Sequence, residues 1–222
     1  MNIDDVYKVV SYMVDKYQGA YLAPNDFNLA INTAQRQYLN FLTGETAEFS
    51  QGRTNKFTGG FSNDVTTGGS LTNFLKEDTL TITNQLAPQP SDFYKISAMR
   101  TIDTPPDNYA VRRVGADKIY AYVGNSIDAP TLTEPIYTEL GTNFKFFPST
   151  LTSAKIIYFR IPAEAKWAYT GDLVYDAANS VQLEWPLNDY NDIIYRTLGI
   201  IGINLKDGDL IRVSQTVKND GQ

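Results

Sequence analysis

The chain opens with two segments whose apolar residues recur every three or four positions, which is the period of an amphipathic helix. The first starts with Asp4 and Asp5, which suit an N-terminal cap and the positive end of a helix dipole. The second runs from Pro24, a residue favoured at the first helical position, to Thr43. Residues 1–42 are therefore predicted to form an antiparallel helical hairpin. Its apolar positions are Val6, Val9, Val10, Met13, Val14, Tyr17, Phe27, Ile31, Ala34, Tyr38, Phe41 and Leu42.

The helical period breaks between residues 43 and 77, where glycine, threonine, asparagine and serine dominate. A structureless stretch of about 30 residues is uncommon inside a compact domain and is usually functional or disordered. Arg53 and Lys56 stand beside Phe57 and Phe61, and this basic and aromatic tip suits contact with a neighbouring subunit. The segment is thus predicted to be an extended loop or arm, with a flexible surface loop as the alternative interpretation.

Residues 78–165 carry the signals of an antiparallel β region. Apolar and polar residues alternate over 79–83, and prolines and glycines separate the later apolar runs. Gly141 lies between two short runs and predicts a β-hairpin, whereas residues 116–123 lack alternation and predict a short helical insert that ends at Gly124. The block is predicted to be a small sandwich or barrel. The remaining predicted strands are 93–102, 135–139, 143–147 and 155–161.

Residues 166–222 are predicted to be a connecting segment followed by C-terminal helices. After Pro186 one stripe of apolar residues recurs at about 100° per residue, formed by Leu187, Tyr190, Ile194, Leu198, Ile201 and Leu205. Ile193 and Ile200 form a second stripe and Ile203 lies opposite, so this helix must be buried on several sides, either within the fold or between subunits. These three isoleucines are candidates for a subunit interface.

The pattern as a whole predicts an α+β fold, in which the N-terminal helix hairpin and the C-terminal helices pack with a central antiparallel β sandwich or barrel. The chain has 222 residues, 42% of them hydrophobic and 20% charged, which is the composition of a folded protein. Its 15 tyrosines exceed the two tryptophans and 11 phenylalanines. Tyrosine suits partly wet interfaces as well as cores, so both interpretations stand.

Composition also restricts the chemistry. The chain has no histidine and no cysteine, which excludes disulfides, thiolate catalysis and the usual general base and zinc ligands. Without a phosphate or metal loop as well, we expect no enzyme, no cofactor and no metal site. A net charge of -6 argues against gripping nucleic acid through its phosphates. No signal-like start and no apolar run of about 18 residues predict a cytoplasmically made protein that does not insert into membranes.

Two other classes of protein remain open at this point. Carboxylates alone can serve an acid-base glycosidase, and exposed aromatic rings on a β-rich scaffold can form a carbohydrate-binding platform. The glycosidase candidates are Glu184, Asp172 and Asp176, and the platform candidates are Trp167, Tyr169 and Trp185. Against the platform, Trp185 and Pro186 directly precede a helix and look like a packing staple.

Several short segments, taken in order, carry a resemblance. They are Ala34–Gln35, Pro135–Tyr137, Phe144–Pro148, Tyr158–Pro162, Leu183–Pro186 and Gly202–Leu205. Their spacing and aromatic-proline punctuation resemble the virion structural proteins of tailed bacteriophages that infect Bacteroidetes. The chain is most similar to the head-to-tail connector or ring proteins of crAss-like phages, over most of its length except the glycine-rich loop.

The resemblance implies a ring subunit without catalytic residues. Such proteins form twelve-fold rings that are stacked below the portal around the DNA exit channel. We therefore expect a homo-oligomeric ring in the virion, in contact with the portal protein and neighbouring ring or tail proteins, through which DNA passes without specific binding. The adaptors of other tailed phages are mostly helical, and the β block departs from them, which leaves the position in the stack open. A non-catalytic carbohydrate-binding or tail-attachment module is the alternative.

Overall fold

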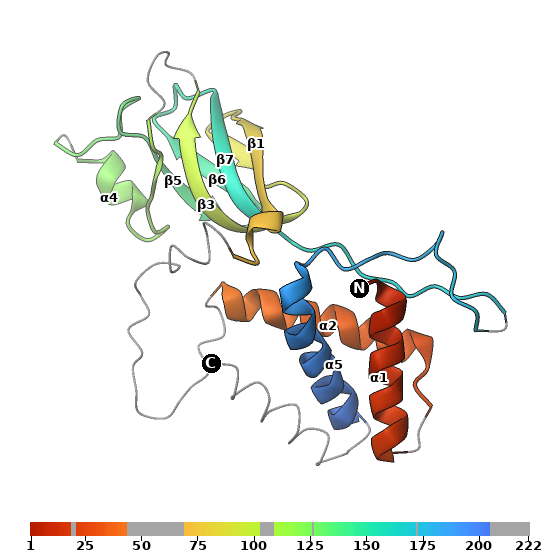
Figure 1. Cartoon of the computed structure of the whole chain (residues 1–222). Helices are drawn as coiled ribbons and strands as arrows, with labels where there is room; N and C mark the ends of the chain where they lie inside the picture. The colour runs from red at the N-terminus through yellow and green to blue at the C-terminus, as the bar shows by residue number, and fades with distance from the viewer. Residues whose placement is uncertain (19–20, 44–68, 103–108, 126, 172, 205–222) are drawn as a thin grey trace, which may run out of the picture. The chain divides into compact units, whose positions relative to one another are not determined.

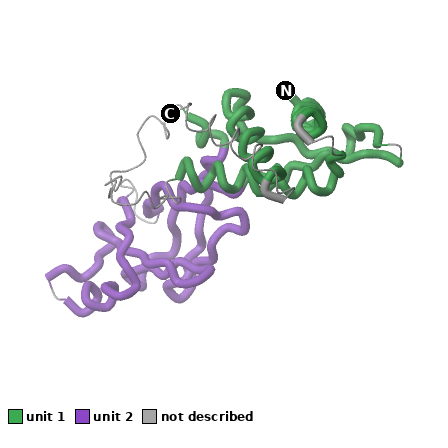
Figure 2. The backbone as a smooth tube through the Cα atoms, turned by 90° about the horizontal axis from the view of Figure 1, so that it is seen from below, with its two compact units in different colours: residues 1–73, 162–222 green, residues 74–161 purple. Residues whose placement is uncertain are grey.

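The computed structural model describes residues 1–18, 21–43, 69–102, 109–125, 127–171 and 173–204. The chain divides into two compact units, which we call unit 1 (residues 1–73 and 162–222) and unit 2 (residues 74–161). Figure 2 shows them in separate colours. Unit 1 contains long helices and unit 2 contains the strands, so the predicted α+β class is confirmed. The N-terminal and C-terminal segments belong to the same unit.

Unit 1 is built on the helices α1 (Ile3–Gln18), α2 (Pro24–Leu42) and α5 (Tyr190–Asn204). Helix α5 packs mainly against α2 and also contacts α1, and α2 runs across both in Figure 1. Most of the predicted apolar positions form the core between them, whereas Val9 and Phe41 are exposed. The buried members of this core include Val6, Val10, Val14, Phe27, Ile31, Ala34, Ile193, Leu198 and Ile201.

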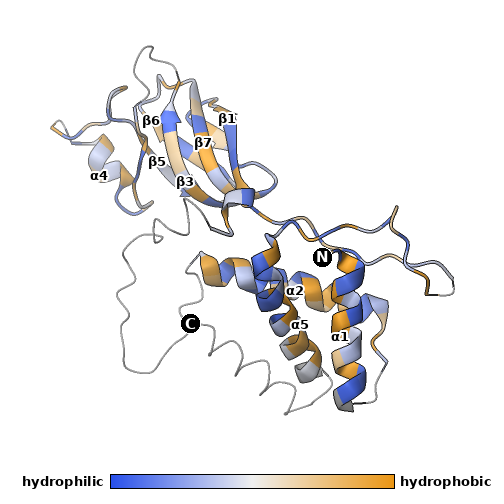
Figure 3. Ribbon diagram, in the orientation of Figure 1, coloured by the Kyte–Doolittle hydropathy of each residue, from blue (hydrophilic) through white to orange (hydrophobic). Residues whose placement is uncertain are grey.

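Short local features of the sequence define where each helix begins. At the start of α1 the Asn2 side chain accepts the amide of Asp5, and the Asp5 carboxylate accepts the amide of Asn2, which is a reciprocal capping box. Helix α2 starts at Pro24, as predicted, and Ala23 before it is extended, the conformation that a following proline favours. Helix α5 follows the short 3-10 turn η2 (Leu187–Asp189) and becomes more hydrophobic after its polar start (Figure 3).

The described residues of unit 2 form seven strands in two sheets. One sheet has the order β1-β7-β3 and the other β2-β6-β5-β4; all neighbouring pairs are antiparallel except β4 with β5. The strands are β1 (Leu75–Thr81), β2 (Leu86–Pro88), β3 (Phe93–Thr101), β4 (Arg112–Arg113), β5 (Ile136–Leu140), β6 (Asn143–Phe147) and β7 (Ser153–Arg160). The turn η1 (Thr72–Phe74) precedes β1.

Side chains from both sheets meet in one hydrophobic core, so unit 2 is a sandwich. The core joins Leu80 and Ile156 of the first sheet to Phe144 and Phe146 of the second. The alternative prediction of a closed barrel is wrong, because the described strands form two separate sheets, each with two edge strands.

Two turns in the sandwich depend on unusual backbone angles. Gly141 has φ +62° and allows the predicted β5–β6 hairpin to reverse within two residues. Between β1 and β2 the chain turns at Asn84 and Gln85, inside the isolated bridge of Thr83 with Leu86, and both residues have positive φ angles, of 51° and 67°. The sequence analysis did not predict this second turn or β2.

The predicted helical insert is α4 (Ile119–Val123), which ends at Gly124. It rests on a small core of its own, separate from the main core of the sandwich. This second cluster contains Val114, Ile119, Ile136 and Phe147, with Tyr122 packed against it. Helix α4 therefore has a fixed position on unit 2 although it is short.

A buried tyrosine connects the sandwich to an ionised carboxylate. Tyr158 of β7 is fully buried and donates to Asp92 Oδ1 over 2.7 Å, while Lys76 Nζ lies 2.8 Å from Asp92 Oδ2. Burial raises the pKa of Asp92, but the hydrogen bonds from Lys76 and Tyr158 outweigh it and hold this pKa below its ordinary 3.8. A lowered carboxyl pKa stabilises the fold above 3.8, and the stabilisation is lost as the pH falls through the folded-state pKa.

Replacing Tyr158→Phe should destabilise unit 2 by roughly 1 kcal/mol at neutral pH, because Asp92 loses a charge-assisted hydrogen bond. The difference from the wild type should shrink as Asp92 becomes protonated below pH 3.8. Chemical unfolding between pH 7 and pH 2.5 measures both effects, with Tyr12→Phe on α1 as the control. A difference that stays constant over this range would show that the hydrogen bond to Asp92 contributes nothing.

Candidate functional site

The segment from Pro162 to Trp185 leaves the sandwich and folds into an irregular hairpin within unit 1. We call this segment the arm; it is not the loop predicted at residues 43–77. Lys166 and Val181 exchange two backbone hydrogen bonds of 3.0 and 2.8 Å, and Tyr169 pairs with Tyr175 nearer the turn. The arm is thus a two-stranded projection with few regular strand residues. Its first strand lies against α2.

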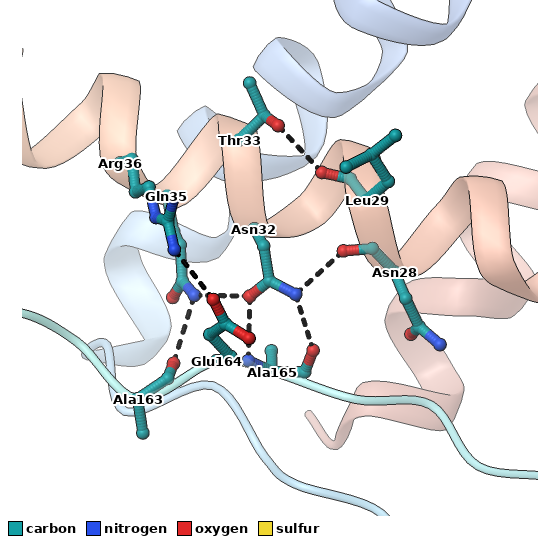
Figure 4. Close-up of polar contacts among 9 residues, drawn as sticks. All are labelled: Asn28, Leu29, Asn32, Thr33, Gln35, Arg36, Ala163, Glu164 and Ala165. Carbon is teal, nitrogen blue, oxygen red and sulfur yellow. Dashed lines mark hydrogen bonds and ion pairs between the residues drawn. The ribbon is translucent and has the colours of Figure 1, made fainter.

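Three carboxamide side chains of α2 hold this first strand. Asn28 accepts the amide of Trp167 over 2.7 Å and donates to its carbonyl over 3.1 Å. Asn32 does the same for Ala165, at 2.9 and 2.8 Å, as Figure 4 shows. Gln35 donates to the carbonyl of Ala163 over 3.0 Å and to Asn32 Oδ1 over 2.7 Å. We call Asn28, Asn32 and Gln35 the amide ladder.

The spacing of the amide ladder explains why a helix can pair with a strand. Four helical residues rise about 6 Å, and two strand residues advance about 6.6 Å. Carboxamides at successive turns of α2 therefore meet every second residue of the arm. Each carboxamide has an N–H donor and a carbonyl acceptor side by side, as a backbone peptide group does, so the ladder takes the place of a neighbouring strand.

The opposite edge of the first arm strand is paired as well. Lys166 bonds to Val181, the amide of Ala168 donates to Ser180 Oγ over 2.9 Å, and the amide of Ala163 donates to Glu184 Oε2 over 2.9 Å. An ion pair between Arg36 and Glu164 at 2.7 Å adds an exposed contact to α2. The first arm strand thus has hydrogen bonds both to α2 and to the second arm strand, which gives the arm a defined position on unit 1.

Both tryptophans serve this packing and are buried. Trp167 stacks on Tyr7 with ring centroids 4.0 Å apart and donates through Nε1 to Asp4 Oδ1 over 3.0 Å. Trp185 contacts Tyr38 and donates to Gln35 Oε1 over 3.3 Å. With exposures of 3% and 4%, neither ring offers a face to a ligand. The predicted carbohydrate platform on these two tryptophans is therefore wrong, and only Tyr169 of that set is exposed.

The two described carboxylates among the glycosidase candidates, Asp176 and Glu184, accept hydrogen bonds within the arm. Asp176 accepts hydrogen bonds from the amides of Ala178 and Asn179 and from the Asn179 side chain, which hold its pKa below the ordinary value. Glu184 accepts the amide of Ala163. Asp172 lies outside the described residues. Among the residues that are described, no three acidic side chains gather at a point that could hold a metal ion.

The predicted interface residues fall in three different places. Arg53, Lys56, Phe57 and Phe61 lie outside the described residues. Ile193 is fully buried in the core of unit 1, which leaves it no surface to offer a neighbouring subunit, and Ile200 is half-buried on α5. Ile203 belongs to α5, but its side chain lies outside the described set.

The exposed apolar end of the arm is a site that the sequence analysis did not single out. Tyr169, Leu173 and Val174 are 42%, 46% and 60% exposed, and we call them the arm tip. The turn is held by hydrogen bonds between Thr170 and Val174 and between Leu173 and Thr170, both of 2.9 Å. An exposed apolar group on a defined projection is typical of a protein contact.

The amide ladder was also missed, although the sequence contains one signal for it. Asn28, Asn32 and Gln35 share one face of a predicted helix at a spacing of four and three residues. Carboxamides along a face that borders the apolar stripe indicate a polar partner beside the core. The sequence does not reveal which segment supplies that partner.

Comparisons with known proteins leave the family open. No protein-family model matches the chain, and no curated protein matches it. None of the helices in the described part of the chain is both long and apolar enough to cross a bilayer.

Asn32→Ala should destabilise unit 1 by about 2 to 4 kcal/mol, because it leaves both the amide and the carbonyl of Ala165 without their partner. Hydrogen exchange at the amide of Ala165 should accelerate together with that of Trp167. The matched control is Thr33→Ala one position along α2, whose hydroxyl bonds only to its own helix. Equal stability of the two variants would mean that the ladder does not hold the arm.

Proposed function

We propose that this protein is a ring subunit of the head-to-tail connector of a tailed bacteriophage, which joins the portal to the tail around the DNA channel. Its role is mechanical. The observation that carries the proposal is the arm, a projection that the amide ladder holds in place and whose apolar tip is exposed. A subunit that assembles by contact with its neighbours needs such an element.

Two of the six segments that carry the resemblance to connector proteins lie at the ends of the arm. Tyr158–Pro162 contains the end of β7 and the first residue of the arm, and Leu183–Pro186 contains its last residues. These aromatic and proline residues thus stand where the chain enters and leaves the projection. The likeness in these segments supports a shared way of placing it.

The distribution of charge supports a passage for DNA. Unit 2 contains nine lysines and arginines and nine aspartates and glutamates, so the net charge of -6 belongs to unit 1. An acidic wall repels the phosphates of DNA and avoids adhesion during packaging and ejection. We assign unit 1 to the channel side on this basis.

In purified particles the protein should occur at the portal vertex with the same copy number as the portal protein. Quantitative mass spectrometry of particles gives the ratio, and cryo-electron microscopy of the vertex gives the position. Detection at a copy number unrelated to the portal, or away from that vertex, would rule out the connector function. The major capsid protein of the same particles serves as the reference for counting.

The purified protein should not retain duplex DNA even at 10 mM salt, because an acidic surface gains no free energy from counterion release. Fluorescence anisotropy of a labelled duplex measures this. A variant in which Asp15, Asp26 and Glu164 of unit 1 become lysine should bind weakly and lose that binding as salt increases. Salt-sensitive binding by the wild type would contradict the proposed channel wall.

A further inference from the structure

Two groups of exposed apolar residues in the described chain are candidates for a contact surface. One is the arm tip in unit 1. The other lies on α4 of unit 2, where Tyr120 is 65% and Val123 is 39% exposed. They differ in the charge that surrounds them, and this difference indicates what each one contacts.

The surface on α4 is bordered by cations. Lys145 Nζ lies 5.5 Å from the centre of the Tyr120 ring and donates to its hydroxyl over 3.3 Å. Arg112 lies 5.0 Å from the centre of the Tyr122 ring. Neither cation forms an ion pair with a described residue, whereas Arg113 beside them pairs with Glu139. We call Tyr120, Val123, Arg112 and Lys145 the α4 face.

The arm has the opposite charge. Between residues 162 and 185 the sequence contains four acidic residues and a single lysine. Asp176 is ionised and has no ion pair with any described residue, and Asn179 and the local amides fix its carboxylate. The apolar arm tip thus belongs to a projection whose sequence is acidic, and the α4 face is an apolar surface with two cations that form no ion pair with any described residue.

We propose that the arm tip of one copy docks on the α4 face of a second copy of this chain. Apolar side chains meet at the centre, and the carboxylate of Asp176 faces Lys145 and Arg112 at the rim. The surfaces belong to different parts of the chain, so the contact is heterologous. Repeating it leads from one subunit to the next and closes a ring when the rotation permits. The inference rests on the proposed ring function and names the partner of each subunit.

The contact is small, so a single arm should bind weakly and a closed ring should be stable because each subunit is held on two sides. The wild type should therefore associate as its concentration rises, from the monomer mass of 24.8 kDa. Sedimentation velocity and light scattering measure this directly.

Two variants test the contact without touching a core. Val174→Asp places a charge in the arm tip, and Tyr120→Asp places one in the α4 face; each should weaken self-association by at least about tenfold. Val181→Asp on the arm and Leu140→Asp at the β5–β6 turn are matched controls, since both residues are exposed outside the two surfaces. Circular dichroism and thermal unfolding confirm that all four variants are folded.

Mixing the two variants gives the decisive result. The Val174→Asp protein keeps an intact α4 face and the Tyr120→Asp protein keeps an intact arm. At high protein concentration a mixture should therefore form a one-to-one complex through this single contact, which neither variant forms alone. Failure of the mixture to associate would overturn the inference, as would a wild type that stays monomeric or controls that dissociate equally. In each of these cases, a copy number in particles equal to that of the portal protein would still support the proposed ring function.

Discussion

The arrangement of unit 1 depends on one constraint, which is that an extended strand must satisfy hydrogen-bonding groups on both of its edges. A second strand does this on one side of the arm, and the amide ladder of α2 does it on the other. The chain can therefore return from the sandwich as a strand and still pack on a helix. Without the carboxamides, the main-chain groups that face α2 would lie beside an apolar surface with no partner.

The ladder also connects to the aromatic packing around it. Gln35 bonds to the arm through its nitrogen and to the Trp185 indole through its oxygen, and it is almost fully buried. Trp167, whose backbone pairs with Asn28, stacks on Tyr7 of α1. The two tryptophans thus anchor the two strands of the arm to α1 and α2, which lie far from the arm in the sequence. Partly satisfied networks of this kind are unstable, so their members depend on one another.

Much of the fold could be predicted from local patterns, and the reason differs by element. The helical period of the apolar residues predicted α1 and α2, Pro24 predicted the start of α2, and Gly141 predicted the β5–β6 hairpin. Strand β1 begins earlier than predicted. The prediction missed its start because the first residues are mostly exposed and charged, so the apolar and polar residues do not alternate there. The turn at Asn84 and Gln85 lacks a glycine. The ladder and the burial of Trp167 depend on residue pairs that lie 128 to 163 positions apart, and no local pattern contains that information.

The amide ladder bonds to main-chain atoms of the arm, so these bonds do not depend on which side chains the arm residues carry. Exposed arm positions such as Glu164 and Lys166 can therefore change identity while the strand keeps its place, and only proline is forbidden where an amide must donate. The position of the arm and the chemistry of its surface are independent properties of the sequence. A lineage of such proteins can alter what the arm touches through substitutions that leave its attachment to α2 intact.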